Sequence, residues 1–276
     1  MMRLARRLLT AHAIVVFLFL YLPIAVLIVF SFNSSRLNVV WVGFTTGWYV
    51  EMARDAQILR AARNSLIVAA LTTLIATPLG TVTAFALARY RFRGKQLLEG
   101  LLYIPIILPE IVMGISLLAF FSLVGMRLGI ATVVVSHITF CAAFVTVVVR
   151  ARLHGLDPVL ERAAMDLGAS AWRTFWKVTL PLVSPGILAG ALIAFTLSLD
   201  DVIIAFFTTG PGATTLPLYV LSMVRLGVSP KVNALSAAML AVTLLCIGLA
   251  FGLRQGRLFG RRRAPRAESD ARPEGD

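Results

Sequence analysis

The sequence has 276 residues, of which 59% are hydrophobic and only 14% are charged. Soluble domains are about 45–50% apolar and about 25% charged, so this composition excludes an ordinary soluble domain and predicts an integral membrane protein. The mean hydropathy of +0.88 agrees. The formal net charge of +13 is a feature of nucleic-acid-binding proteins too, and its meaning depends on where the basic residues lie.

Six apolar runs are each long enough to cross about 30 Å of hydrocarbon at about 1.5 Å per helical residue. They cover residues 13–32, 64–88, 100–125, 128–149, 182–208 and 232–253. The first follows Arg3, Arg6 and Arg7, as the core of a signal peptide would, but it is long and no small-residue cleavage site clearly follows it. We therefore predict an all-α protein whose residues 1–253 form one six-span domain.

The basic residues are distributed unevenly between the two sides of these spans. Nineteen Lys and Arg residues lie at the N-terminus, in the 89–95 and 150–177 loops and after residue 253, and seven lie on the opposite side. Because Lys and Arg are enriched in cytoplasmic loops, both termini and the 150–177 loop are predicted to be cytoplasmic. The positive charge is thus a topology signal and argues against a nucleic-acid partner. The basic tail at 254–276 is predicted to be disordered.

The loop at 150–181 is the only long polar run between two strongly apolar runs. Asp157 can cap a first short helix that has Pro158 at its opening position, and Gly168 can end that helix in the left-handed conformation. Ser170 can cap a second helix. The second helix carries three aromatic residues: Trp172, Phe175 and Trp176. The pattern predicts a cytoplasmic docking element, with a merely amphipathic loop as the alternative.

One motif in this loop starts at Ala163-Ala164, continues at Gly168 and, after nine intervening residues, ends in Val178-Thr-Leu-Pro181; it resembles the EAA loop of ABC-importer permeases. The resemblance implies the type I importer permease fold and a coupling helix that inserts into a groove of a cytoplasmic ATPase. The residues that it assigns to this coupling are Glu161, Arg162, Ala163, Ala164, Asp166, Gly168, Leu180 and Pro181. The leading Glu of the family motif falls at Arg162, with Glu161 one place earlier, so the role of Glu161 stays open.

Three carboxylates lie inside the apolar runs: Glu110, Asp200 and Asp201. A charge at the bilayer centre costs about 2.5–3.5 kcal/mol on insertion scales, so such groups face a cavity, a partner or each other. Neighbours on a helix point about 100° apart. Asp200 and Asp201 therefore cannot both line one narrow pore unless the helix breaks, and one of them is expected to face a partner subunit or cap a new helical segment. A structural hydrogen bond is the alternative for each carboxylate.

Intramembrane carboxylates without intramembrane Lys or Arg favour a cationic substrate. Several further blocks resemble the putrescine/spermidine permeases, and most closely the second of the two permease subunits: Leu108–Val112, Ser136–Cys141, Phe195–Val202, Thr209–Pro217 and Met223–Leu235. This resemblance implies a bacterial inner-membrane complex of two different permeases and two ATPase subunits, to which a periplasmic binding protein delivers a polyamine.

No other constellation in the sequence suggests chemistry. There is no phosphate-binding Gly-rich lysine loop and no nucleophile with a nearby base, so we predict a transport subunit that is not an enzyme. ATP and Mg²⁺ are expected on the ATPase chain, and Cys141 and Cys246 give no metal spacing. His137 is expected to be a packed, hydrogen-bonded histidine. The alternatives are a permease for ferric iron, a sugar or an anion, an autonomous channel, or an integral membrane enzyme.

Overall fold

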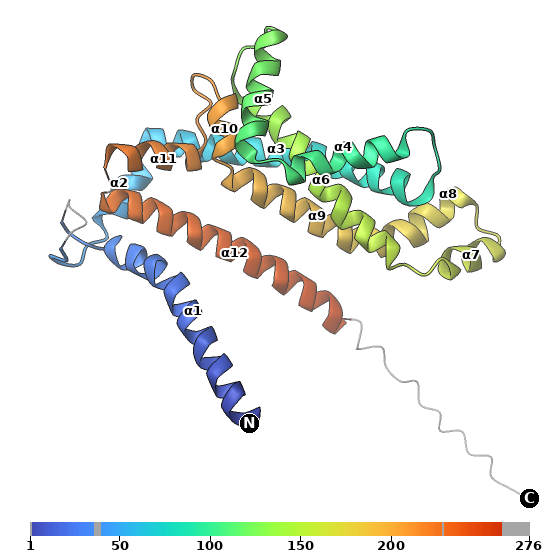
Figure 1. The fold of residues 1–276 in the computed structure, drawn as a ribbon, viewed down its shortest axis with the longest axis horizontal. Coiled ribbons are helices and arrows are strands. Elements are labelled where there is room, and N and C mark those ends of the chain that lie inside the picture. Colours follow the sequence, from blue (N-terminus) through green and yellow to red (C-terminus); the bar gives the residue numbers. More distant parts are fainter. Residues whose placement is uncertain (1, 36–39, 228, 261–276) are drawn as a thin grey trace, which may run out of the picture.

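A computed structural model of the chain describes residues 2–35, 40–227 and 229–260. The long helices are α1 (Met2–Phe30), α3 (Ala56–Arg89), α6 (Ile130–His154), α9 (Leu180–Asp200) and α12 (Pro230–Gly260). The shorter elements are α2 (Gly47–Arg54), α4 (Lys95–Ile107), α5 (Glu110–Leu123), α7 (Val159–Asp166), α8 (Ala171–Thr174), the π-helix η1 (Phe175–Thr179), α10 (Ile203–Thr208) and α11 (Leu216–Leu226). The predicted all-α fold is confirmed (Figure 1).

Four helical runs in the described residues are long and apolar enough to cross a membrane: Ala5–Phe30, Ala56–Arg89, Ile130–His154 and Ala171–Asp200. The pair formed by α4 and α5 adds a fifth span if the bent pair is counted as one. The sixth predicted run lies in α12, which continues to Gly260, beyond the predicted end at 253. Length and apolarity thus support four or five spans, with α12 in the place of the sixth. Most of the predicted tail, from 261 to 276, lies outside the described residues.

Two of the predicted spans are not single helices. The run at 100–125 breaks at Leu108, which is extended, and Pro109, and the two halves are bent by 113°. A proline has no N–H to continue the helix, and it disfavours the helical conformation at the preceding residue. The run at 182–208 breaks at Asp201, whose backbone is extended before α10 begins. Each run was predicted as one span; the bend at Leu108 and Pro109 was not predicted, whereas a new helical segment at Asp200 and Asp201 was one of the expected outcomes.

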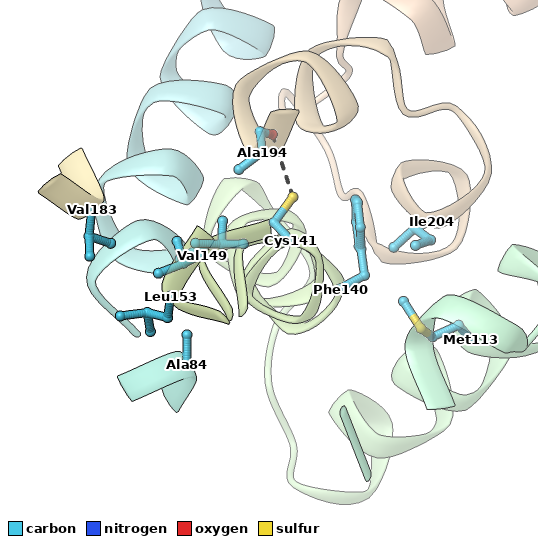
Figure 2. Packing of buried hydrophobic residues seen from close by; sticks show 11 residues of the cluster. Ala84, Met113, Phe140, Cys141, Val149, Leu153, Val183, Ala194 and Ile204 are labelled. Carbon is cyan, nitrogen blue, oxygen red and sulfur yellow. Dashed lines mark hydrogen bonds between the residues drawn. The ribbon is translucent and has the colours of Figure 1, made fainter. Parts of the chain in front are cut away.

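The core lies where α3, α6 and α9 pack against one another (Figure 1). Val145 of α6 is fully buried between a glycine on each neighbour. A Cβ atom at Gly80 of α3 would lie 2.7 Å from Val145 Cβ, and one at Gly190 of α9 would lie 3.2 Å from Val145 Cγ1. Small residues let membrane helices approach this closely, and van der Waals contact then holds them together. Figure 2 shows Cys141, with its Sγ 3.5 Å from the Ala194 carbonyl, in the same interface.

The end of the bundle that topology predicts to be the outer one is tied together by polar side chains. Asn64 of α3 donates from Nδ2 to the carbonyls of Gly212 (2.9 Å) and Thr214 (3.0 Å), which fixes the loop before α11. Lys231 Nζ lies 2.8 Å from Asp55 Oδ2 and joins α12 to the start of α3. Elsewhere α1 and α12 lie apart from the three-helix core (Figure 1).

Candidate functional site

The segment between α6 and α9 folds as the helix–turn–helix that the sequence predicts. Asp157 Oδ1 accepts a hydrogen bond of 2.9 Å from the Val159 amide at the start of α7. Gly168 has a φ of +86° just beyond the end of α7, the left-handed conformation that glycine adopts without strain. Ser170 Oγ accepts from the Arg173 amide at 3.3 Å and caps α8. The three punctuating residues therefore act as predicted.

This helix–turn–helix presents a large apolar surface. Leu167 is 89% exposed, Trp172 is 71% exposed and Trp176 is 49% exposed. The two indole rings meet edge to face with centroids 5.5 Å apart. Phe175 differs from its neighbours, because its ring packs against Phe85 of α3 with centroids 5.4 Å apart. Two tryptophans on a segment outside the predicted spans form the kind of patch that marks a protein interface.

Glu161 lies beneath this surface, with a side chain that is only 15% exposed. Both of its carboxylate oxygens accept from the guanidinium of Arg89, the last residue of α3, and the Nη2–Oε1 distance is 2.6 Å. Thr179 of η1 donates to Oε1 at 2.5 Å. The hydrogen bonds from Arg89 hold the pKa of the Glu161 carboxyl below its ordinary value of 4.5, while burial opposes this shift and Thr179 adds to it. The carboxylate is therefore ionised at neutral pH.

The other residues of the predicted coupling set lie nearer the surface. Ala164 and Leu180 are partly buried, whereas five members are exposed: Arg162, Ala163, Asp166, Gly168 and Pro181. Arg162 stands in the position of the motif's leading Glu, and its side chain forms no hydrogen bond or ion pair with another described residue. The motif's charged positions thus divide between an inward-facing Glu161 and an outward-facing Arg162.

The second halves of the two broken runs pack together within the predicted membrane region. α10 lies against α5, and a Cβ atom on Gly114 of α5 would come within 2.6 Å of the Phe207 ring. Thr132 of α6 donates from Oγ1 to the Thr208 carbonyl at 2.7 Å and so holds the end of α10. The short helix α10 is therefore fixed by α5 on one side and by α6 at its C-terminus.

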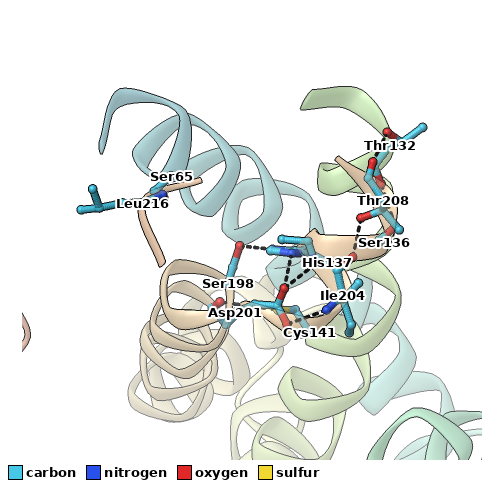
Figure 3. Close-up of polar contacts among 12 residues, drawn as sticks. Ser65, Thr132, Ser136, His137, Cys141, Ser198, Asp201, Ile204, Thr208 and Leu216 are labelled. Atoms are coloured by element: carbon cyan, nitrogen blue, oxygen red, sulfur yellow. Dashed lines mark hydrogen bonds and ion pairs between the residues drawn. The ribbon is translucent and has the colours of Figure 1, made fainter. Parts of the chain in front are cut away.

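Asp201 fixes the other end of α10. Its Oδ2 accepts from the Ala205 amide at 2.7 Å, and its Oδ1 accepts from the Ile204 amide at 3.4 Å (Figure 3). The same carboxylate lies 3.2 Å from Nε2 of His137, a side chain of α6 with no solvent exposure. The other ring nitrogen of His137, Nδ1, lies 2.8 Å from Ser198 Oγ. Asp201 therefore caps a new helical segment, one of the two outcomes expected for this pair from the sequence.

Asp200 and Glu110 lie at the same two breaks but in different surroundings. Asp200 is the last residue of α9 and Glu110 is the first residue of α5. Both are exposed, and neither side chain forms a hydrogen bond or an ion pair with another described residue. The runs at 100–125, 128–149 and 182–208 contain no Lys or Arg. Two unpaired carboxylates thus remain at interruptions of membrane helices.

Comparisons with known proteins agree with this geometry. The model of the family described as "Binding-protein-dependent transport system inner membrane component" matches residues 76–263. The chain belongs to this family. It is therefore a transport component of the inner membrane that crosses the bilayer several times, and it is not an enzyme.

The chain is also similar to individual relatives in sequence and to solved structures in fold. The chain is 47% identical over 232 residues to the spermidine/putrescine transport system permease protein PotC of Escherichia coli (strain K12), which covers 84% of this chain and 88% of the relative. It is 45% identical over 231 residues to the putrescine transport system permease protein PotI of the same strain, with 81% and 82% covered. A crystal structure of a bacterial ABC transporter that imports the acidic polysaccharide alginate matches with a TM-score of 0.70 and 19% identity over 95% of this chain and 96% of that chain. This last likeness supports the ABC type I importer permease fold alone.

The sequence patterns located the helix–turn–helix and the three intramembrane carboxylates. They missed the residues that contact Glu161 and His137. Arg89 counts only as a cytoplasmic charge in the sequence, and 72 positions separate it from Glu161. Ser198 and Thr179 are hydroxyl residues in apolar surroundings, without a motif of their own. Only tertiary packing brings Arg89 and Thr179 to Glu161 and places Ser198 beside His137.

Proposed function

We propose that this chain is one of two different membrane subunits of an ATP-driven importer of polyamines such as putrescine and spermidine. A periplasmic binding protein delivers the amine to the outer face, and two ATPase subunits that bind ATP and Mg²⁺ dock on the cytoplasmic face. The proposal takes its substrate class from the relatives, whose names state spermidine and putrescine transport.

The observation that carries the cation assignment is the state of Asp200 and Glu110. Each is exposed at a break in a membrane helix and lacks an ion-pair partner among the described residues. Ammonium groups lose tightly held water on entering a narrow passage, and carboxylates replace part of it through charge-assisted hydrogen bonds. The absence of Lys and Arg from the surrounding runs removes the repulsion that a cation would otherwise meet. Asp201, which contacts His137 and the start of α10, has a structural role beside the proposed passage.

The proposed ATPase contact is the surface formed by Leu167, Trp172 and Trp176. ATP binding closes the ATPase dimer and moves the docked segment, and the spans then change which side of the pathway is open. With an ATPase docked at this surface, the segment and both termini lie in the cytoplasm in our proposal, and the excess of basic residues on that side supports this orientation.

A competition assay on the whole complex tests the substrate assignment. The two permeases, the ATPase and the binding protein are reconstituted in liposomes, and uptake of radiolabelled putrescine is measured against unlabelled competitors. We expect spermidine to compete and a neutral sugar, an anionic sugar acid and ferric iron to have no effect. ATP-dependent uptake of one of these other solutes without amine uptake would contradict the proposal.

A further inference from the structure

We propose that Arg89, Glu161 and Thr179 form a clasp between the spans and the helix–turn–helix of α7 and α8, which we call the coupling segment. The clasp makes α3 and α9 move together with this segment. The clasp deepens the proposed function, because it rests on the docking of an ATPase at α7 and α8. Its residues join three elements: the end of α3, the first turn of α7 and the π-helix η1.

The clasp is the link between α7 and the spans. Among the hydrogen bonds and ion pairs of the described residues, those of Glu161 are the only side-chain bonds that join α7 to another helix. The other side-chain hydrogen bond of α7 among the described residues, from the Val159 amide to Asp157, stays at the start of the helix. Apart from apolar contact and the chain itself, α7 is therefore joined to α3 through one carboxylate.

The second route from the coupling segment runs along the chain itself. α8, η1 and α9 form one helical run from Ala171 to Asp200, so a displacement of Trp172 reaches α9 directly. The run contains a π-helix at Phe175–Thr179, a local irregularity that often marks functional sites in helices. Thr179, which is only 3% exposed, sits at the last position of this irregularity. Its hydroxyl binds the same carboxylate that holds Arg89.

The geometry of the clasp suits the transmission of force. A carboxylate that meets a guanidinium through both oxygens is fixed in direction as well as in distance. Partial burial of Glu161 and the ring contact between Phe85 and Phe175 keep the two helices in register beside it. Without Glu161, α9 would still be pulled through the chain, but α3 would be held to the segment by apolar contact alone. Because α3 and α9 both pack on α6, loss of the clasp changes the angle at which they move.

A charge-swap series tests the clasp in the complete complex. The variants are Glu161→Gln, Arg89→Glu, Glu161→Arg and the double variant Arg89→Glu/Glu161→Arg. Arg91→Glu is the matched control. Arg91 is exposed in the loop that follows α3, two positions after Arg89, and its side chain has no hydrogen bond or ion pair with another described residue. The readouts are the kcat and KM for ATP hydrolysis with and without the system's binding protein, and the amount of ATPase that co-purifies.

We expect each single variant of the clasp to keep its basal hydrolysis, its KM for ATP and its bound ATPase. The kcat in the presence of the binding protein should fall by about tenfold, which is the effect of losing a charge-assisted hydrogen-bonded pair. The double variant should recover at least about half of the lost stimulation, because it restores the pair with the charges exchanged. Thr179→Val keeps the shape of the side chain and should cost about threefold.

Three results would overturn the clasp. The first is full stimulation in Glu161→Gln and Arg89→Glu. The second is a double variant no better than the single ones. The third is a loss of co-purifying ATPase that accounts for the whole effect, since Glu161 would then serve folding or docking only. The readout is independent of the amine: a wild-type complex that responds to its binding protein but takes up no putrescine contradicts the substrate assignment and leaves the clasp to be judged by hydrolysis.

Discussion

The Nε2 atom of His137 lies 3.2 Å from Oδ2 of Asp201, and this contact joins the middle of α6 to the break between α9 and α10. The other ring nitrogen of His137, Nδ1, lies 2.8 Å from Ser198 Oγ, so the same side chain also contacts α9 just before the break. The contact separates two adjacent aspartates into different roles. Asp201 holds the backbone of α10, and Asp200 is left exposed at the end of α9.

The first prediction compares these neighbours. Asp201→Ala removes the carboxylate that accepts from two amides at the start of α10, and loss of such a helix cap costs about 0.5–2 kcal/mol. Asp200→Ala removes no described contact and should leave stability unchanged. The measurement is the thermal unfolding midpoint of the purified permease complex in nanodiscs. Equal midpoints for the two variants would show that Asp201 is not a structural cap.

A second prediction concerns the turn at Gly168. Its φ of +86° costs a residue with a Cβ about 1–2 kcal/mol, and a β-branched residue suffers most. No atom lies within 4 Å of the position that a Cβ would take, so the effect is one of backbone strain without a clash. Gly168→Val should lower transport while membrane insertion survives, and Gly168→Asn, which tolerates this conformation, should be milder. Full transport and normal ATPase coupling in Gly168→Val would show that the turn is not needed.

The sequence predicted well wherever a local rule applied. Each cap, at Asp157 and at Ser170, bonds to an amide at most three positions away, and the turn at Gly168 depends on that residue's own backbone. The apolar runs follow from composition. Prediction left alternatives open where tertiary contacts decide the outcome. The break at Asp201 depends on amides of the next helix and on His137, which lies 64 positions earlier. Leu108-Pro109 is a local signal for a break, but hydropathy alone joins the two halves.

The third prediction is a pH dependence of the Glu161 clasp. Because the pKa of Glu161 is lowered in the folded chain, its contribution to stability is complete above its ordinary value of 4.5 and is lost as the pH falls through the lowered value. The stability difference between wild type and Glu161→Gln should therefore be constant near neutral pH and shrink in acid. Thermal midpoints of both proteins at pH 7, 5 and 3.5 provide the test. A difference that grows in acid would mean that the pKa is shifted in the opposite direction.

The fourth prediction concerns topology. Cysteines introduced at residues 91 and 270 should react with an impermeant thiol reagent only from the cytoplasmic side, and one at residue 45 only from the outside. The background is a variant in which Cys141 and Cys246 are replaced by alanine. Residue 270 lies outside the described residues, so its label reports the side of the C-terminus alone. Labelling from the opposite sides would show that the orientation is the reverse of the predicted one, with the Trp172 surface on the side away from a cytoplasmic ATPase.

The most direct test of the central claim is ATP-dependent uptake of radiolabelled putrescine by the reconstituted complex, with wild-type chain, Asp200→Asn and Glu110→Gln side by side. Both substitutions keep the size and hydrogen bonding of the side chain and remove its charge. The account predicts uptake that requires ATP, a fall of about tenfold in Asp200→Asn and a smaller fall in Glu110→Gln, at equal amounts of assembled complex. Absence of ATP-dependent amine uptake in the wild type, or equal uptake by all three proteins, would contradict it.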